Sequence, residues 1–297
     1  MKGGEWVQVL SLVEIMATLD GEGGVEGLPF MPEMARYCGG HFRISAVMHK
    51  ICGGGKGMRE IRGTPLLLLD ELRCDGFDHG GCSRLCTLLW KGAWLKPAAV
   101  SISGRAEEPG KMDAVWHFPA GTGGGTYSCQ ATRLSLATTP LSLVRKLKMA
   151  MDDVAAGEWS FMAFLKLFVR WVACRVRWLS GLILGKGKGK KPTPTEILAL
   201  QPGEWVWTKS VKEIARSLDG HNKNRGLDFS VYMEPFCGKK YRVKARVGNF
   251  IHERTGKMTE LKNTVILEGV SCGGDTTSGI CRRAECLYWR EIWLQRE

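Results

Sequence analysis

Two stretches of the chain, one near each end, repeat the same order of hydrophobic and polar positions. Residues 5–10 and 204–209 alternate large apolar side chains with polar or β-branched ones, which predicts half-buried strands. A short helical pattern follows each run, at 11–19 and 210–218. It starts at a serine and has a glutamate three residues later, as in a capping box. Both halves are therefore expected to open with a strand and a capped helix.

Identical residues at a constant spacing extend this relation along the chain. Gly4-Glu5-Trp6-Val7 recurs as Gly203-Glu204-Trp205-Val206, an offset of 199 residues. The same offset relates further pairs, among them Cys38/Cys237, Gly39/Gly238, Arg43/Arg242, Trp90/Trp289 and Trp94/Trp293. A repeat of this length indicates an internal duplication. Features that both copies share are expected to serve the fold, and features that only one copy has are candidates for special chemistry.

Each copy contains several more strand-like runs. A turn after each of the paired cysteines leads into a second strand, and later runs lie at 66–72 and 90–95 in the first copy and at 265–270 and 289–294 in the second. Four or five short strands with glycine-rich turns are typical of a small SH3-like barrel, with a generic α+β domain as the alternative. The paired tryptophans are expected in the barrel core.

We therefore predict a mainly β protein with added helices, built from two tandem SH3-like barrel modules and a partly helical insert. The first module spans 1–97, the insert 98–201 and the second module 202–297. The insert is expected to contain a strand at 126–129 and two helices between 141 and 184.

The second predicted helix of the insert is both apolar and basic. Lys166, Arg170 and Arg177 fall on one half of its helical wheel. A glycine-rich linker follows and adds Lys186, Lys188, Lys190 and Lys191. Cations within the helix argue against a transmembrane span. A helix packed on the barrels and a helix lying in a membrane interface are both compatible with the pattern.

Charge is distributed unevenly along the 297 residues, which carry a net charge of +12. The first module is neutral, and the excess of lysine and arginine lies in the insert and the second module. A positive field of this kind attracts nucleic acid or an anionic membrane surface, or it serves only solubility. The basic insert is the candidate surface for such a partner.

Cysteine usage points to thiol chemistry rather than to a disulfide framework. The chain has 11 cysteines and begins without the basic-then-apolar run of a signal peptide, so we expect a cytoplasmic protein, with peripheral membrane association through the insert as an extension. The first module contains the densest set, Cys52, Cys74, Cys82 and Cys86. Four thiolates suit a tetrahedral Zn²⁺ site, although an iron–sulfur cluster uses the same ligands. His49, His79 and Cys129 are possible additional ligands.

The second module has lost part of this set. Gly248 occupies the position of His49, Ile251 that of Cys52 and Glu285 that of Cys86, whereas Cys272 and Cys281 persist. A set of cysteines and histidines that is complete in just one of the two copies indicates a metal site, because residues needed for the core would be kept in both copies. Unrelated buried or redox-active thiols remain the other interpretation.

Several sequence blocks resemble a family of uncharacterised bacterial proteins. The resemblance rests on Gly4-Glu-Trp-Val, Arg73-Cys-Asp-Gly76, His79-Gly-Gly-Cys82, Tyr127-Ser-Cys-Gln-Ala-Thr132 and Tyr288-Trp-Arg-Glu-Ile-Trp-Leu294, and it covers nearly the whole chain. It implies the duplicated architecture and no particular activity. The pattern also resembles, loosely, the SH3-like barrels of accessory subunits.

Three functional hypotheses follow. The first is a metal-binding tandem-barrel protein, with a structural zinc site, that binds a protein partner of a bacterial pathway. The second is a metalloenzyme whose metal keeps an open position. The third is a binder of nucleic acid or anionic membranes. The sequence contains no paired-carboxylate motif, nucleophile elbow, phosphate-binding loop or His-Glu-x-x-His motif.

Overall fold

The fold was analysed in a computed structural model of the chain. The structure describes residues 1–53, 57–70, 72–98, 125–142, 192–230, 232–272 and 282–297, with eight further positions between 144 and 169. The protein is mainly β. It forms two compact units whose borders differ from the predicted ones: unit 1 comprises Met1–Leu141, Asn249–Glu260 and Cys281–Arg283, and unit 2 comprises Ser142–Gly248, Leu261–Ile280 and Ala284–Glu297.

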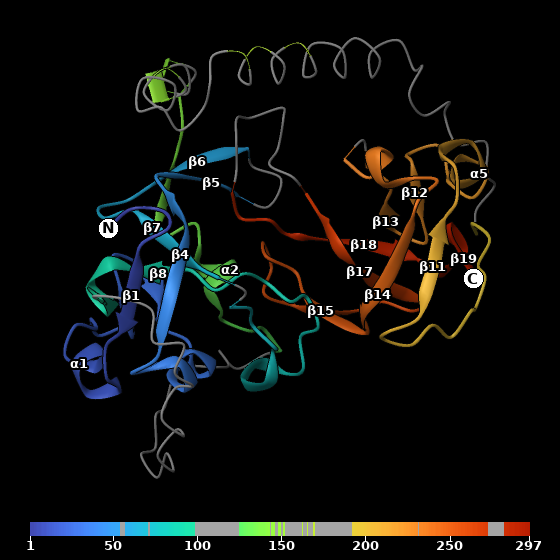
Figure 1. Cartoon of the computed structure of the whole chain (residues 1–297). Helices are drawn as coiled ribbons and strands as arrows, with labels where there is room; N and C mark the ends of the chain where they lie inside the picture. The colour runs from blue at the N-terminus through green and yellow to red at the C-terminus, as the bar shows by residue number, and fades with distance from the viewer. Residues whose placement is uncertain are drawn as a thin grey trace. The chain divides into compact units, whose positions relative to one another are not determined.

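The centre of unit 1 is a five-stranded antiparallel sheet with the order β8-β7-β4-β1-β9 (Figure 1). Its strands are β1 (Trp6–Val9), β4 (His41–Met48), β7 (Leu66–Leu69), β8 (Trp90–Lys91) and β9 (Leu95–Pro97). Along β4 the register shifts between Ile44 and Ala46. A β-bulge bends a strand and increases its twist, so β4 can pair with β1 over its first half and with β7 over its second.

The predicted capped helix is confirmed as α1 (Leu12–Met16). The Ser11 hydroxyl accepts a hydrogen bond from the Glu14 N–H, and the Glu14 carboxylate accepts one from the Ser11 N–H at 2.8 Å. The β2–β3 hairpin (Gly24–Val25 and Leu28–Pro29) and the 3-10 helix η1 (Pro32–Tyr37) complete the connection from α1 to β4.

Aromatic residues from this connection and from the C-terminal strands form the core of unit 1. Trp90 and Trp94 are fully buried, as predicted, and the Phe30 ring meets the Trp94 ring edge-on at 5.3 Å between centroids. The side chains of Val7 and Val9, on one face of β1, are also fully buried. Edge-to-face pairs add to the hydrophobic contribution of such large side chains.

Unit 1 contains further elements that the sequence patterns did not predict. A three-stranded sheet consists of β5 (Lys50–Cys52), β6 (Met58–Ile61) and β10 (Thr138–Pro140). The short helix η2 (Phe77–His79) lies between β7 and β8, and α2 (Gln130–Arg133) precedes β10. The hairpin of β15 (Asn249–Ile251) and β16 (Met258–Glu260) also belongs to unit 1, although it comes from the second half of the sequence.

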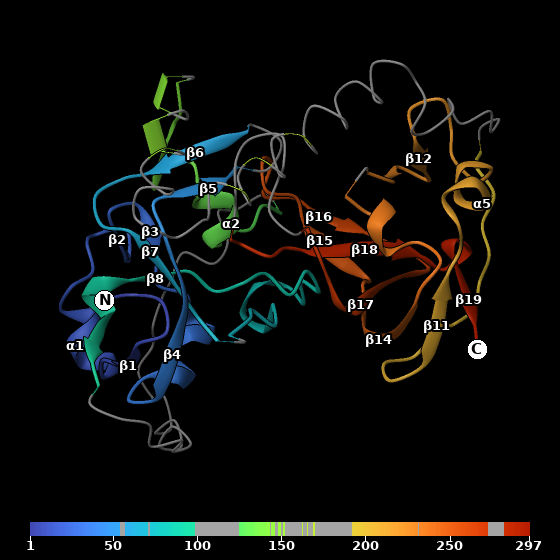
Figure 2. The same ribbon diagram turned by 45° about the horizontal axis from the view of Figure 1, so that its top comes forward.

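Unit 2 contains a five-stranded antiparallel sheet with the order β18-β17-β14-β11-β19 (Figure 2). Its strands are β11 (Trp205–Thr208), β14 (Lys240–Arg246), β17 (Thr264–Ser271), β18 (Cys286–Arg290) and β19 (Leu294–Arg296). The register of β11 on β14 is the one that the 199-residue offset predicts, because Trp205 lies opposite Arg242 as Trp6 lies opposite Arg43. A bulge again follows, between Val243 and Ala245.

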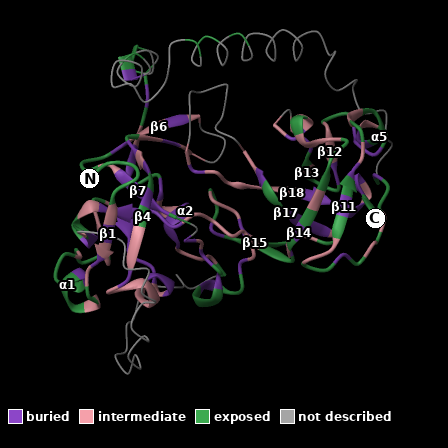
Figure 3. Ribbon diagram, viewed as in Figure 1, coloured by how far each residue is buried: buried purple, intermediate pink, exposed green. Residues whose placement is uncertain are grey.

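The remaining elements of unit 2 follow the same order as in unit 1. They are the capped helix α5 (Val211–Ala215), the β12–β13 hairpin (Lys223–Asn224 and Leu227–Asp228) and η4 (Glu234–Phe236). Trp289, Trp293 and Phe229 are buried together, with ring centroids 5.4 Å apart for the Phe229–Trp293 pair. In both sheets, buried positions alternate with more exposed ones along the first strand (Figure 3).

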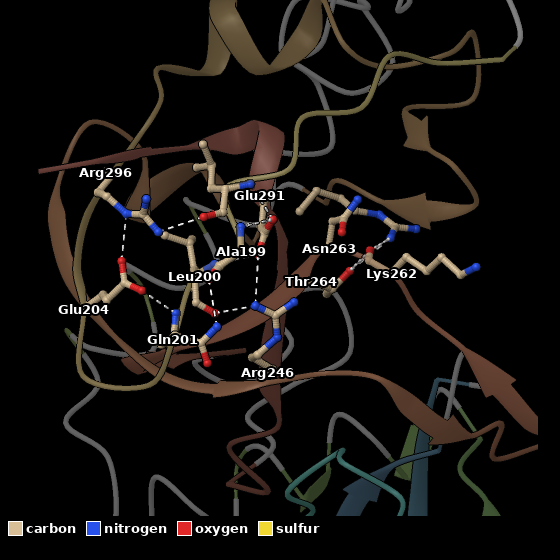
Figure 4. A network of polar contacts seen from close by, with 12 residues as sticks. Ala199, Leu200, Gln201, Glu204, Arg246, Lys262, Asn263, Thr264, Glu291 and Arg296 are labelled. Atoms are coloured by element: carbon tan, nitrogen blue, oxygen red, sulfur yellow. Dashed lines mark hydrogen bonds and ion pairs between the residues drawn. The ribbon is translucent and has the colours of Figure 1, made fainter.

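A fully buried carboxylate holds the chain entry to unit 2 in place. Glu291 accepts hydrogen bonds from the N–H groups of Leu198, Ala199 and Leu200 at 2.7, 3.1 and 3.0 Å (Figure 4). The Arg246 guanidinium lies 3.6 Å from the same carboxylate and donates to the Leu200 carbonyl. Three backbone donors and one cation compensate for the burial of the charge.

Three predicted strands are wrong in detail. The runs at 90–95 and 289–294 are each interrupted by a 3-10 turn, η3 (Gly92–Trp94) and η5 (Glu291–Trp293), so each run gives the end of one strand and the start of the next. The run at 126–129 contains only one isolated bridge, from Thr126 to Lys257.

The basic helix and linker of the insert, with Lys166, Arg170, Arg177, Lys186, Lys188, Lys190 and Lys191, lie outside the described residues. Among the helices that are described, none is long and apolar enough to cross a bilayer.

Candidate metal centre

Potential metal ligands of unit 1 converge on one small cavity. The cavity measures about 20 Å³, and the side chains that line it include Glu33, Cys74, His79, Cys82, Cys86 and Cys129. This volume is enough for a single water molecule or ion. Of the seven ligand candidates predicted from the sequence, five line this cavity: Cys74, His79, Cys82, Cys86 and Cys129.

The closest contact in the cavity joins a thiol and an imidazole. Cys74 lies after β7, and its Sγ is 3.3 Å from Nε2 of His79 at the end of η2. In a tetrahedral site with Zn–S of about 2.3 Å and Zn–N of about 2.0–2.1 Å, the two ligand atoms lie roughly 3.5 Å apart. The observed separation therefore fits two ligands of one ion.

The other nitrogen of the same imidazole faces a carboxylate. His79 Nδ1 lies 3.8 Å from Glu33 Oε1, and one ligand atom from each of Glu33, Cys74 and His79 fits within a span of 4.8 Å. A histidine that binds a metal commonly directs its second ring nitrogen to a carboxylate, which fixes the ring orientation. The sequence patterns do not connect Glu33 with this site, because it lies far from the cysteines in the chain.

Buried polar atoms at this site lack hydrogen-bond partners among the described residues. Glu33 and His79 are each 3% exposed, and Glu33 Oε2 and His79 Nδ1 form no hydrogen bond. Native proteins rarely leave such atoms unsatisfied, and those that they do leave call for an explanation. A bound cation compensates a buried carboxylate and orders the imidazole beside it.

Glycines allow the loop between Cys74 and Cys86 to close. Gly76 has a left-handed φ of 72°, and a Cβ atom added there would lie 2.0 Å from the Cys82 carbonyl oxygen. The Cys74 N–H donates to the Cys86 carbonyl at 2.8 Å, which ties the two ends of the loop together. The Arg36 guanidinium, 2.7 Å from the Asp75 carboxylate, attaches the loop to η1.

Cys82 and Cys129 reach the cavity from two other directions. The Ile251 N–H of the β15–β16 hairpin donates to Cys82 Sγ at 3.4 Å. Cys129 caps α2, and the neighbouring Gln130 side chain anchors that helix through hydrogen bonds with the Leu89 backbone N–H and carbonyl at 2.9 and 2.8 Å. The hairpin from the second half of the chain thus contributes directly to the site.

Arg84 and Arg283 line one side of the cavity, and both pair with a carboxylate of the same hairpin. The Glu253 carboxylate lies 2.8 Å from the Arg84 guanidinium and 3.2 Å from that of Arg283. The Arg283 carbonyl also accepts a hydrogen bond from the Thr87 hydroxyl at 2.9 Å. No sequence pattern indicates this cluster, because its members are separated by up to about two hundred positions and no motif relates them.

Two predicted ligand candidates lie elsewhere. Cys52 is at the end of β5, opposite Met58, and is not among the residues that line the cavity. His49 is exposed between β4 and β5. In unit 2, the Cys272 N–H donates to the Glu285 carbonyl at 2.8 Å, so the backbone link of Cys74 with Cys86 recurs there with a glutamate in place of the second cysteine. Cys281 lies outside the described residues.

Two thiols in the cavity, those of Cys74 and Cys129, are not poised as nucleophiles. Burial, followed by the Glu33 carboxylate, raises the pKa of Cys74, and burial also raises the pKa of Cys129. A reactive cysteine needs a lowered pKa. Burial similarly raises the pKa of Cys38 to about 11, and burial with the Glu234 carboxylate raises that of Cys237 to about 12, in agreement with a packing role for this repeated pair.

Comparison with protein-family models, with curated proteins and with solved structures found no match for this chain. The geometry of the cavity is therefore the basis for any functional assignment.

Substitution of Gly76 is expected to disrupt the site more than substitution of Gly81. Both glycines have a left-handed φ, so a Cβ atom strains either one by about 1 kcal/mol. Only at Gly76 does that atom also collide with backbone, whereas nothing lies within 4 Å of it at Gly81. We expect Gly76→Ala to lower the melting temperature of unit 1 clearly more than Gly81→Ala, as followed by thermal denaturation. Equal shifts for the two variants would contradict the close approach of Gly76 to Cys82.

Proposed function

We propose that this chain is a metal-binding protein in which Cys74, His79, Cys82 and Cys86 hold one Zn²⁺ that stabilises unit 1. The observation that carries the proposal is the Cys74–His79–Glu33 arrangement in a cavity that two further loop cysteines also line. These four ligands lie within thirteen consecutive residues, as in compact structural zinc sites. Cys129 is the alternative fourth thiol, and Cys52 is not part of the proposed set.

The ligand set favours a structural zinc site over catalysis and over an iron–sulfur cluster. Four protein ligands complete a tetrahedral zinc site and leave no position for a substrate. A histidine nitrogen close to the Cys74 thiol suits zinc better than an iron–sulfur cluster, which is usually held by thiolates alone.

We further propose that each unit is an SH3-like barrel and that the two arose by duplication. The equal strand orders, the bulge at matching positions and the 3-10 turn before each last strand support this interpretation. Nine described cysteines are free thiols, which fits a reducing compartment such as the cytoplasm. In this view the zinc stabilises one barrel of a protein that acts by binding a partner.

Metal analysis of the full-length protein tests the zinc site. Protein purified under reducing conditions is expected to be colourless and to contain about one zinc per chain, and Cys74→Ser or His79→Ala is expected to lose it. Cys52→Ser and Cys237→Ser are the controls and should retain the metal. Absorption near 400 nm together with bound iron would show that the site holds an iron–sulfur cluster instead of zinc. Wild-type protein that is purified without metal and does not take up added zinc would refute the site.

The choice among the cavity cysteines can be resolved with the same assay. Cys129→Ser is expected to retain zinc, whereas Cys82→Ser and Cys86→Ser are expected to lose it. Zinc loss in Cys129→Ser together with retention in His79→Ala would instead assign a four-thiolate site.

A further inference from the structure

The sheet of unit 2 presents an aromatic and basic face to solvent. Trp205 and Trp207 are 48% and 46% exposed and lie two residues apart on β11. Side chains at alternate positions of a strand point to the same face of the sheet, so both indoles lie on the face opposite the buried Val206 and Thr208. Large exposed aromatic residues side by side on a rigid strand are uncommon unless they bind something.

Cations lie directly beside the two indoles. In the antiparallel register, Trp205 lies opposite Arg242 and Trp207 opposite Lys240, both exposed on β14, and Lys244 is exposed further along that strand. The Lys240 ammonium lies 5.1 Å from the centroid of the Trp205 ring. Within the described part of the chain, Glu297 forms an ion pair with Lys240, and Lys240, Arg242, Lys244 and Glu297 together carry a net positive charge.

The corresponding face of unit 1 is an internal comparison. The 199-residue offset places Gln8 at the position of Trp207, His41 at Lys240 and Ser45 at Lys244, while Trp6 and Arg43 match Trp205 and Arg242. Unit 2 therefore has one more indole and two more lysines on the same scaffold. Because the shared fold does not require these residues, they are candidates for a function of unit 2 alone.

We infer that this face of unit 2 binds single-stranded nucleic acid, with bases stacked on Trp205 and Trp207 and phosphates paired with Lys240, Arg242 and Lys244. Stacking on aromatic side chains beside a row of cations is the usual way in which sheet-based domains bind single strands. The inference is independent of the zinc site, which lies in unit 1.

A membrane surface fits this face less well. Insertion into a bilayer needs a cluster of apolar side chains next to the cations. Among described residues 192–297, the exposed large hydrophobic side chains are Ile197, Trp205 and Trp207. The two indoles thus provide flat stacking surfaces without the surrounding aliphatic residues that a membrane anchor would have.

The test uses the full-length protein and fluorescently labelled twelve-nucleotide oligo-uridine and oligo-thymidine, with binding measured by anisotropy. Trp207→Gln introduces the residue that unit 1 has at this position, Gln8, and is expected to weaken binding about tenfold. The triple variant Lys240→Gln, Arg242→Gln, Lys244→Gln is expected to weaken binding further and to reduce its dependence on salt concentration. Arg43→Gln, at the equivalent position of unit 1, is the control and should leave binding unchanged.

Three results would overturn the inference. They are absence of oligonucleotide binding at low salt, equal affinity of the Trp207→Gln and wild-type proteins, and an equal loss in the Arg43→Gln control. Binding to vesicles that contain anionic lipid, abolished by Trp207→Gln while oligonucleotide binding persists, would assign the face to a membrane instead. Circular dichroism of each variant ensures that a folded sheet is compared in every case.

Discussion

If the proposed zinc site is correct, removal of the metal is expected to open residues 72–88 of unit 1 and to leave its central sheet folded. The proposed ligands all lie in this segment, and a bound metal would add to the contacts that already close it, among them the Cys74–Cys86 backbone hydrogen bond, the Arg73–Thr87 bridge and the Arg36–Asp75 ion pair. Structural zinc contributes on the order of 10 kcal/mol in domains that depend on it. Unit 1 has its own core around Phe30, Trp90 and Trp94, so the effect should remain local.

Hydrogen exchange measures this effect residue by residue. Treatment with a chelator under reducing conditions is expected to raise the exchange of amides in 72–88 about a hundredfold or more, and the Ile251 amide, which donates to Cys82 Sγ, should follow. Amides of β17 in unit 2 serve as the internal control. Unchanged exchange in 72–88 after verified zinc loss would show that the metal does not hold this loop.

Replacement of Glu291 by alanine is expected to destabilise unit 2 by about 3 kcal/mol. The substitution leaves the N–H groups of Leu198, Ala199 and Leu200 without their acceptor and the Arg246 guanidinium without its partner (Figure 4). Ala199 has a left-handed φ of 49°, which the three hydrogen bonds help to maintain. The chain entry before β11 should therefore detach first.

Native-state hydrogen exchange on β11 and β14 gives the free energy of opening for this unit. Glu204→Gln is a matched control, because Glu204 also accepts a backbone hydrogen bond, from Gln201, and pairs with an arginine, but at the surface. The Glu204→Gln substitution should lower the free energy of opening of unit 2 by at most about 1 kcal/mol. Similar values for the two variants, or an equal change in the sheet of unit 1, would contradict the proposed role of Glu291.

The local elements could be predicted from the sequence because their determinants are local. The Ser11–Glu14 and Ser210–Glu213 capping boxes, the alternation along β1 and β11 and the buried tryptophan pairs all follow from short-range patterns. The 3-10 turns η3 and η5 were missed because an apolar run conceals a break that depends on tertiary packing.

The candidate site was predicted only in part. Cys74, Cys82 and Cys86 lie close together in sequence, so their spacing suggested a shared ion. Glu33 and the β15–β16 hairpin reach the same cavity from distant positions, and no local pattern indicates that. Cys52 was included because cysteine count alone does not show which way a strand directs its side chains.

Unit 1 combines the N-terminal part of the chain with segments that are synthesised much later, so it cannot finish folding early in synthesis. Its N-terminal 141 residues cannot acquire the Ile251 and Glu253 contacts until the ribosome has translated more than a hundred further codons. A nascent chain arrested before that point would expose the thiols of the loop without their final enclosure. Full enclosure of this loop would then be a late step in the folding of unit 1.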